Sequence, residues 1–392
     1  MVRQLVDAYV EAGDTIEVLC GDSPGETFLN SVACPLHALG PSHLGNFAFS
    51  PRLWRWLRQN AHRFDGIVMN GIWTFPDLAV RAAARRAQVP YGVFPHGALD
   101  PWFNRTYPLK HLKKTLYWPL QHAVLRDARA VFFTTETERD LASTSFRPNG
   151  WNSVVVPFGI NDPEKPRKES GDGGINAAVP IKPRGATPAE QIEAFYRTMP
   201  QLRERSYLLF LGRLHEKKGC DLLIRAFAAT AALAPQVDLV MAGPDPEGLK
   251  SKLQRLAEKL GIHSRVHWPG MIAGDIKWGA LRACGAFVLP SHQENFGVAV
   301  IESLAVGRPV LISDQVNIWP EIKADAVGLV EEDTLEGTER LLQRWFNLPT
   351  EERDAMATGA RAAFLMRYTM NRTASAINRF FSSRELATQI GV

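Results

Sequence analysis

The sequence predicts an α/β protein made of two doubly wound domains, each built on a parallel sheet. Short, almost continuously apolar runs alternate with helical stretches along the chain, which is typical of strands buried on both faces of a parallel sheet. Residues 167–204, rich in Pro, Gly, Ala and charge, separate two blocks of this alternation. A chain of 392 residues is also long enough for two domains.

The first domain is predicted over residues 1–166. Residues 1–13 favour a helix, and five apolar runs favour strands: 15–20, 66–69, 91–94, 130–134 and 153–157. Helical stretches such as 78–88 lie between the strands. We interpret residues 167–204 as an interdomain linker that holds one helix near 188–196.

The second domain is predicted over residues 205–369 and repeats the scheme. Its strand candidates are 207–212, 238–242, 266–268, 286–289, 309–313 and 327–330. A last helical stretch is predicted at about 371–386, within the C-terminal segment 370–392.

The segment after the strand candidate 286–289 carries two carboxylates in an unusual setting. A polar elbow with Glu294 leads into an almost wholly apolar helix that carries Glu302 in its second turn. An ionised carboxylate on an apolar helix is costly unless it is paired, so its partner is a protein group or a ligand hydroxyl or cation. Eight positions span about 12 Å of helix, roughly the reach from a hexose across a diphosphate to a ribose. The free N–H groups at the helix start near Phe296 and Gly297 suit an anion.

A basic turn follows the strand candidate 207–212. Ligands of doubly wound sheets bind outside the carboxyl ends of strands, so Arg213 and Lys218 are expected at the ligand site. Arg presents a planar fork to phosphate oxygens and Lys a point charge, which suits a diphosphate. Lys217 is the less favoured choice because Lys218 directly precedes Gly219. For the lysines alone, a solvated basic loop is the alternative.

Together these residues resemble the Glu-x7-Glu motif of family-4 retaining glycosyltransferases, which have the GT-B fold of two Rossmann-like domains facing a cleft. The resemblance implies donor contacts along the second domain. Glu294 and the backbone after it, at Asn295, Phe296 and Gly297, are implied to hold the donor sugar, and Glu302 the ribose. Arg213 and Lys218 are implied to hold the diphosphate, and backbone groups around Met271 and Ile272 the base. The alternative is a helix-capping acid at Glu294 and a structural ion pair at Glu302.

In the first domain the family carries a His-Gly pair at the end of a strand, and His96 is implied to contact the donor sugar or its phosphate, although a structural histidine is the commoner role of such a residue. Polar and aromatic groups expected of an acceptor site follow neighbouring strands: Asn70, Trp73, Asp100 and Trp102. Both tryptophans have simple packing as an alternative. The family's last helix packs back on the first domain, which is the expectation for 370–392.

The resemblance implies a metal-independent hexosyltransferase that uses a UDP-sugar or GDP-sugar as substrate and no cofactor. The expected acceptor is a glycan or a polyprenyl-diphosphate-linked glycan of an exopolysaccharide or other surface polysaccharide. Two alternatives stay open: a nucleotide-sugar 2-epimerase, and a catalytically impaired binding subunit. The second arises because family members open with a strand and a Gly-rich turn, whereas residues 1–13 already form the first helix. We therefore expect the first sheet to lack a central strand, either because the chain begins inside a longer protein or because this protein has lost the strand and its turn.

Composition limits the remaining possibilities. The net charge of +4 is too small to indicate nucleic-acid binding. The four cysteines show no metal-ligand spacing, and no apolar run approaches a transmembrane helix or a cleavable signal, so a reduced cytoplasmic protein is expected.

Residues 105–129 form a basic segment with six Lys or Arg residues and one acid, Asp127. Four leucines fall near one face of the predicted helix: Leu109, Leu112, Leu116 and Leu120. A basic amphipathic helix suits the anionic inner face of the cell membrane, and peripheral contact there is one interpretation. The other is a solvated helix whose leucines face the core.

Overall fold

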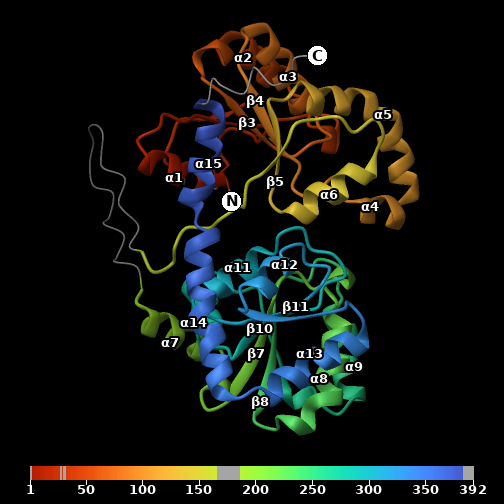
Figure 1. The fold of residues 1–392 in the computed structure, drawn as a ribbon, viewed down its shortest axis with the longest axis vertical. Helices are drawn as coiled ribbons and strands as arrows, with labels where there is room; N and C mark the ends of the chain where they lie inside the picture. The colour runs from red at the N-terminus through yellow and green to blue at the C-terminus, as the bar shows by residue number, and fades with distance from the viewer. Residues whose placement is uncertain (1, 27–28, 30–31, 166–185, 383–392) are drawn as a thin grey trace. The chain divides into compact units, whose positions relative to one another are not determined.

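The structure, a computed structural model, describes residues 2–26, 29, 32–165 and 186–382. The chain forms two compact units. Unit 1 comprises Met1–Asn161 and Thr369–Val392, and unit 2 comprises Asp162–Tyr368. Each is an α/β body with parallel strands, which confirms the predicted fold class (Figure 1).

Unit 1 opens with α1 (Val2–Glu11), and its strands form two separate parallel sheets. The smaller sheet pairs β1 (Val18–Cys20) with β2 (Leu36–Ala38). The larger sheet runs β3 (Ile67–Asn70), β4 (Tyr91–Phe94), β5 (Ala130–Phe133) and β6 (Ser153–Val155) in that order. The longer helices of this unit are α2 (Pro51–Asn60), α3 (Phe75–Ala87), α4 (Pro101–Thr106), α5 (Pro108–Asp127), α6 (Glu136–Ser145) and α15 (Met370–Ser382).

The divided sheet of unit 1 agrees with the expected lack of a central strand. β1 pairs only with β2 and β3 only with β4 on one side, so no strand of the described residues joins the two sheets. β4 and β5 are buried throughout, whereas β1 is half-buried and Asn70 at the end of β3 is exposed. Incomplete burial of β1 and β3 follows from their position at sheet edges.

α15 packs on unit 1, where the C-terminal helix was expected. The Phe380 ring lies 5.4 Å from the Phe132 ring of β5, centroid to centroid. Near the start of α15, Thr373 Oγ1 accepts a hydrogen bond of 2.9 Å from the backbone N–H of Gly159. Residues 383–392, at the end of the predicted helix, lie outside the described residues.

Unit 2 holds one six-stranded parallel sheet. Its order is β12 (Gly328–Glu331), β11 (Val310–Ser313), β10 (Ala286–Leu289), β7 (Ser206–Leu211), β8 (Val237–Ala242) and β9 (Val266–Gly270). The chain runs outward from β7 to β9 and, in the opposite direction, from β10 to β12, so the topological switch point lies between β7 and β10. The longer helices are α7 (Pro188–Thr198), α8 (Cys220–Thr230), α9 (Lys250–Lys259), α10 (Gly274–Ala283), α11 (Val298–Ala305), α12 (Trp319–Ala324), α13 (Leu335–Asn347) and α14 (Thr350–Arg367).

α7 forms where the sequence predicted a helix within the linker, but it packs as part of unit 2. Gln191 Nε2 donates to Asp275 Oδ1 of α10 at 3.1 Å, and Arg282 Nε of α10 donates to Gln191 Oε1 at 2.8 Å. Gly279 permits this close approach, since a Cβ there would collide with the carbonyl of Gln191. Residues 166–185 of the predicted linker lie outside the described residues.

α5 leaves its leucines exposed to solvent. The exposed fractions of Leu109, Leu112, Leu116 and Leu120 are 80%, 60%, 78% and 54%. The interpretation in which these leucines face the core is therefore wrong. The buried face of α5 is formed by other residues: Trp118, Gln121, Val124 and Leu125.

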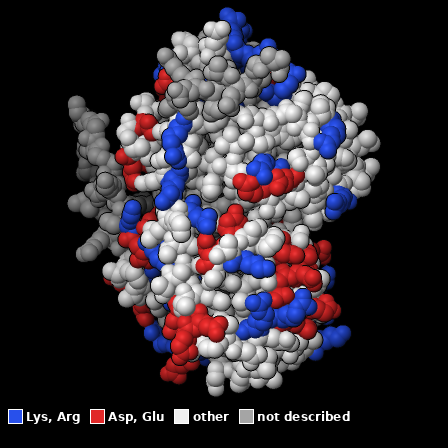
Figure 2. Space-filling model, viewed as in Figure 1, with Lys and Arg blue, Asp and Glu red and all other residues white. Residues whose placement is uncertain are grey.

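The surface seen in Figure 2 differs in charge between the two units. Over unit 2, in the lower half of the view, acidic and basic side chains are intermingled and frequent, whereas the visible face of unit 1 shows larger uncharged areas with scattered acidic and basic side chains. In the part of the chain that the structure describes, no helix combines the length and apolarity that a membrane span requires.

Candidate functional site

The switch point of unit 2 brings the two predicted loops together. The loop after β10 is tied to the loop after β7 by two hydrogen bonds to the Lys217 carbonyl, from the His292 N–H at 2.8 Å and from Ser291 Oγ at 3.0 Å. Gly219 has a φ of +64°, and a Cβ there would collide with the carbonyl of Pro290. The loops therefore form one rigid rim at the carboxyl ends of the strands.

Lys218 and Glu294 form an ion pair across this rim. Their side chains are only 14% and 21% exposed, so the pair is largely desolvated. Sequence reasoning placed both residues at the site but gave them separate ligands. In the structure each is the other's partner, and an anion that binds Lys218 frees the Glu294 carboxylate for ligand hydroxyls.

Arg213 follows β7 on the same loop as Lys218 and is an available cation. It is exposed and has no hydrogen bond or ion pair with any described residue. Its backbone is held on both sides: the Gly212 N–H donates to the Ala242 carbonyl at 3.0 Å and the Leu214 N–H to the Pro244 carbonyl at 2.9 Å. The position of Arg213 is thus fixed while its guanidinium is free to contact a phosphate.

α11 begins at the position predicted for an anion. Gly297, with a φ of +72°, is its N-cap and supplies no side-chain cap to the first N–H groups. The backbone of Glu294 is anchored just before it, with its N–H donating to the Gln315 carbonyl at 2.9 Å and its carbonyl accepting from the Asn317 N–H at 3.0 Å. Phe296 is buried against Tyr368, with ring centroids 6.0 Å apart. The loop 315–317 was not found from the sequence.

Glu302 pairs with Lys277 of α10, at 2.6 Å between Oε1 and Nζ. The carboxylate on the apolar helix therefore has a protein partner, one of the two possibilities that the sequence left open. The two side chains are 12% and 23% exposed. Nothing in the local sequence around Lys277 indicates this role, because the pair joins two different helices and its members are 25 positions apart in the chain.

The two residues expected near the nucleotide base follow β9. Met271 is 73% exposed and Ile272 is buried. β9 is separated from β10 by β7 and β8, so these residues lie about 14 Å along the same edge from the Glu294 loop, at three strand spacings. Their role in base binding stays a prediction.

In unit 1 the structure brings His96 and Asn70 together. His96 Nε2 lies 3.0 Å from Asn70 Oδ1, and the imidazole stacks on Phe94 with ring centroids 5.4 Å apart. Burial lowers the pKa of His96 to about 4. The ring is therefore neutral at neutral pH, and with Nε2–H directed to Asn70 it presents the Nδ1 lone pair to a hydroxyl rather than a positive charge to a phosphate.

Glu138 fixes the turn that carries His96, and sequence reasoning missed it. Its Oε1 accepts from the Gly97 N–H at 2.6 Å, and its Oε2 accepts from the N–H and Oγ1 of Thr134 at 2.7 and 2.6 Å. Glu138 is buried and lies in the first turn of α6, where a carboxylate is favoured. The sequence signal for Glu138 was an acidic residue about one helical turn after the end of the strand predicted at 130–134.

The other acceptor candidates have structural partners within unit 1. The Trp73 N–H donates to Gln121 Oε1 at 2.9 Å, and its Nε1–H donates to the Ala98 carbonyl at 3.3 Å. Asp100 caps α4 by accepting from the Trp102 N–H at 2.8 Å. These contacts match the packing alternative for Trp73 and give Asp100 a local structural role, whereas Asn70 hydrogen-bonds to His96.

Within residues 2–26, 29, 32–165 and 186–382, no three His, Cys, Asp or Glu residues gather closely enough to hold a metal ion.

Comparison with known families matches both units. The family model described as glycosyl transferase 4-like domain matches residues 1–159, and the model described as glycosyl transferases group 1 matches residues 196–363. A D-inositol 3-phosphate glycosyltransferase of Streptomyces griseus is 34% identical over 164 residues, which is 39% of this chain and 34% of that protein. The chain spans less than two fifths of the length of the first curated relatives that it matches.

Solved structures share the fold over nearly the whole chain. The HepE protein of Anabaena, solved in complex with UDP and glucose, has a TM-score of 0.70 at 17% identity, covering 97% of this chain and 95% of that one. WaaG, a glycosyltransferase involved in lipopolysaccharide biosynthesis, has a TM-score of 0.66 at 18% identity, with coverage of 97% and 95%. At these identities the likeness concerns the fold.

Proposed function

Because residues 1–159 belong to the glycosyl transferase 4-like domain family and residues 196–363 to glycosyl transferases group 1, we propose that this protein is a retaining hexosyltransferase. The donor is a nucleotide diphosphate sugar. The acceptor is a glycan, free or linked to polyprenyl diphosphate, in surface polysaccharide synthesis. HepE, solved with UDP-glucose, supports a UDP-sugar as the first donor to test.

One observation carries the proposal. At the switch point of unit 2, the Lys218–Glu294 pair and the N-terminus of α11 share one rim with Arg213, which no described residue pairs with. The rim offers two cations and free backbone N–H groups to a diphosphate, and a carboxylate to sugar hydroxyls. This combination suits a nucleotide diphosphate sugar better than a phosphate alone.

The proposed reaction needs no covalent nucleophile on the protein. The bond between C1 of the hexose and the diphosphate oxygen breaks, and the acceptor oxygen bonds to C1 on the same face. The acceptor proton passes to an oxygen of the departing diphosphate. Arg213, Lys218 and the N-terminus of α11 stabilise the charge that develops on the diphosphate, which is why no metal ion is required in this scheme. Neutral His96 accepts a hydrogen bond from a sugar hydroxyl.

We also propose a peripheral membrane contact through residues 105–129. The exposed leucines of α5 lie among the cations Arg105, Lys110 and Lys113, and residues 101–126 contain no Asp or Glu. Apolar burial at the interface and attraction to anionic lipid then act together, with about 1 kcal/mol per cation near the surface.

The proposed function is tested first by donor binding and then by product analysis. We expect calorimetric titration with UDP, GDP and ADP to give saturable binding of one of them without added metal. The corresponding sugar nucleotide should then yield a glycosylated acceptor and free nucleoside diphosphate, at a rate that EDTA leaves unchanged.

Other outcomes point to the two alternatives. An epimerised sugar nucleotide released in the absence of acceptor indicates a 2-epimerase. Tight nucleotide binding with no turnover on any acceptor indicates a binding subunit. If none of the three nucleotides binds, the proposed function is wrong.

A further inference from the structure

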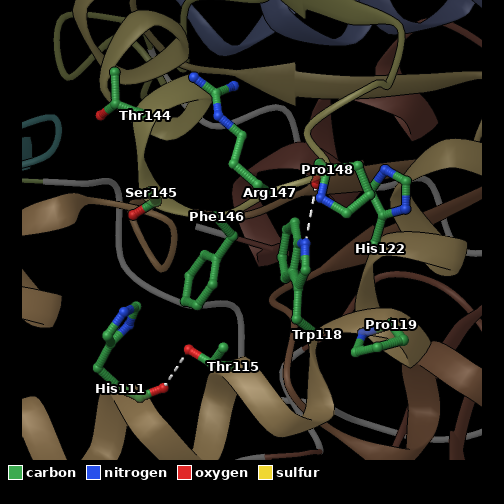
Figure 3. A pocket seen from close by; sticks show the side chains of 10 residues that line it. All are labelled: His111, Thr115, Trp118, Pro119, His122, Thr144, Ser145, Phe146, Arg147 and Pro148. Carbon is green, nitrogen blue, oxygen red and sulfur yellow. Dashed lines mark hydrogen bonds between the residues drawn. The ribbon is translucent and has the colours of Figure 1, made fainter.

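A pocket lies in unit 1 between α5 and the end of α6. Its volume is about 470 Å³, within the range of small-molecule sites. α5 contributes one wall: His111, Thr115, Trp118, Pro119 and His122. The other wall is residues 144–148, and Figure 3 shows the two walls meeting at the Trp118 and Phe146 rings.

Two buried nitrogen atoms of the pocket have no hydrogen-bond partner, His111 Nδ1 and His122 Nε2. Neighbouring polar groups are satisfied, since Trp118 Nε1 donates to the Pro148 carbonyl at 3.0 Å and Thr115 Oγ1 to the His111 carbonyl at 3.0 Å. Unpaired buried polar atoms are costly, so a ligand that pairs with them is stabilised. Burial lowers the pKa of His122, and no Asp or Glu lines the pocket, so its imidazole offers neutral hydrogen bonds.

The pocket combines these two imidazoles and the Arg147 side chain with two aromatic rings that are themselves largely buried. Trp118 and Phe146 stack with ring centroids 4.6 Å apart, and His111 lies 5.1 Å from Phe146. Figure 3 shows His111 and His122 on opposite sides of this stacked pair. Imidazole groups beside aromatic rings suit a sugar, whose hydroxyls pair with the imidazoles while its C–H groups contact the rings.

The exposed leucines lie on the adjacent face of the same helix. Leu112, Leu116 and Leu120 each follow a pocket residue by one position, which is a rotation of about 100° around α5. An apolar stripe beside a sugar-sized pocket matches a molecule with a lipid chain and a carbohydrate head. A soluble sugar would need the pocket and not the stripe.

We propose that the pocket between α5 and α6 binds the carbohydrate headgroup of a glycolipid while the leucine stripe rests on the bilayer. This inference rests on the proposed membrane contact and names the kind of lipid that the contact selects. It assigns His111 and His122 to the headgroup and Leu112, Leu116 and Leu120 to the apolar phase.

The test is flotation of the full chain with three sets of vesicles: phosphatidylcholine, phosphatidylcholine with phosphatidylglycerol, and the second mixture with monoglucosyl diacylglycerol. We expect binding to the anionic vesicles and roughly tenfold tighter binding when the glycolipid is present, the size of two neutral hydrogen bonds. Replacing both His111 and His122 with Leu in one variant should remove only the tenfold increase in vesicle affinity that the glycolipid gives. Leu112→Ser with Leu116→Ser should remove binding to every vesicle.

Matched variants show whether a loss of binding comes from unfolding of the protein. His62→Leu changes an exposed histidine of the same unit and should leave all binding unchanged. His122→Gln keeps a hydrogen-bonding side chain and should retain part of the increment. Titration with UDP should be the same for all these variants, which separates failure here from failure of the proposed transferase.

Equal affinity for vesicles with and without glycolipid in the unmodified protein overturns the headgroup assignment. The headgroup assignment is also overturned if the folded variant with both histidines replaced still binds glycolipid vesicles more tightly than vesicles without glycolipid. If the leucine variants bind vesicles normally but lose a dimer seen by sedimentation, the stripe is a contact between copies and the membrane contact is wrong.

Discussion

Replacing Arg213 or Lys218 with Ala is expected to weaken nucleoside diphosphate binding roughly ten- to hundredfold, because a hydrogen bond to a charged group contributes about 1.5–3 kcal/mol. Arg213 is exposed and has no protein partner among the described residues, so its removal should leave the melting temperature unchanged. Lys218→Ala also leaves the Glu294 carboxylate without its cation, and some loss of stability is expected there.

Calorimetric titration with the preferred nucleotide measures this effect. Arg255→Ala and Lys259→Ala are the matched controls, since both residues are exposed on α9 of the same unit. They carry the same charges, so a loss of affinity shared by the controls would be a nonspecific effect of net charge. Unchanged affinity in both Arg213→Ala and Lys218→Ala would remove the diphosphate from the rim between β7 and β10.

Substitutions of Glu302 and Glu294 are expected to impair different steps, nucleotide binding and sugar transfer. Glu302→Gln should weaken binding of the bare nucleotide about tenfold or more through lost ribose hydrogen bonds. Glu294→Gln should leave nucleotide binding nearly intact and lower the rate of sugar transfer, because the Glu294 carboxylate is assigned to the sugar of the ligand, besides its ion pair with Lys218. Titration with the nucleotide and an initial-rate assay with the sugar nucleotide, run on both variants, measure the contrast.

The pair between Glu302 and Lys277 provides the control for a purely structural role. If Glu302 serves only that pair, Glu302→Gln and Lys277→Met should lower the melting temperature to a similar extent and leave nucleotide affinity unchanged in the folded protein. Glu258→Gln, at an exposed position of α9, accounts for the loss of one negative charge. Equal loss of bare nucleotide binding in Glu294→Gln and Glu302→Gln would contradict the division of roles.

The local sequence pattern predicted most of the helices and strands of the fold. Buried parallel strands such as β4 and β10 appear as unbroken apolar runs, and α11 begins directly after Gly297 as its neighbours predict. β2 was missed because its three half-buried residues, Leu36–Ala38, are too few to show a period. The divided sheet of unit 1 also agrees with the sequence, which predicted that a central strand would be lacking among its described strands.

The sequence predicted which residues make up the candidate site but not which of them pair with each other. Arg213, Lys218 and Glu294 were placed together because loops at the carboxyl ends of neighbouring parallel strands converge. The ion pairs of Glu294 and Glu302 join residues 76 and 25 positions apart in the chain. No local period records such a contact. The same holds for Glu138, whose acceptance from the Gly97 N–H depends on the pairing of β4 with β5.

The sequence by itself determined that this chain forms two parallel α/β units with cations and carboxylates at strand ends, because apolar periodicity and turn residues act over a few neighbouring positions. Only the tertiary structure decided which face of α5 is buried. A leucine stripe is compatible with either core or solvent, and the outcome depends on Trp118, Gln121, Val124 and Leu125 filling the interior instead. The tertiary structure also determined that Trp73 is held by Gln121 and Ala98 and that His96 is neutral. Burial and hydrogen-bond partners are set by segments that meet only in the folded chain.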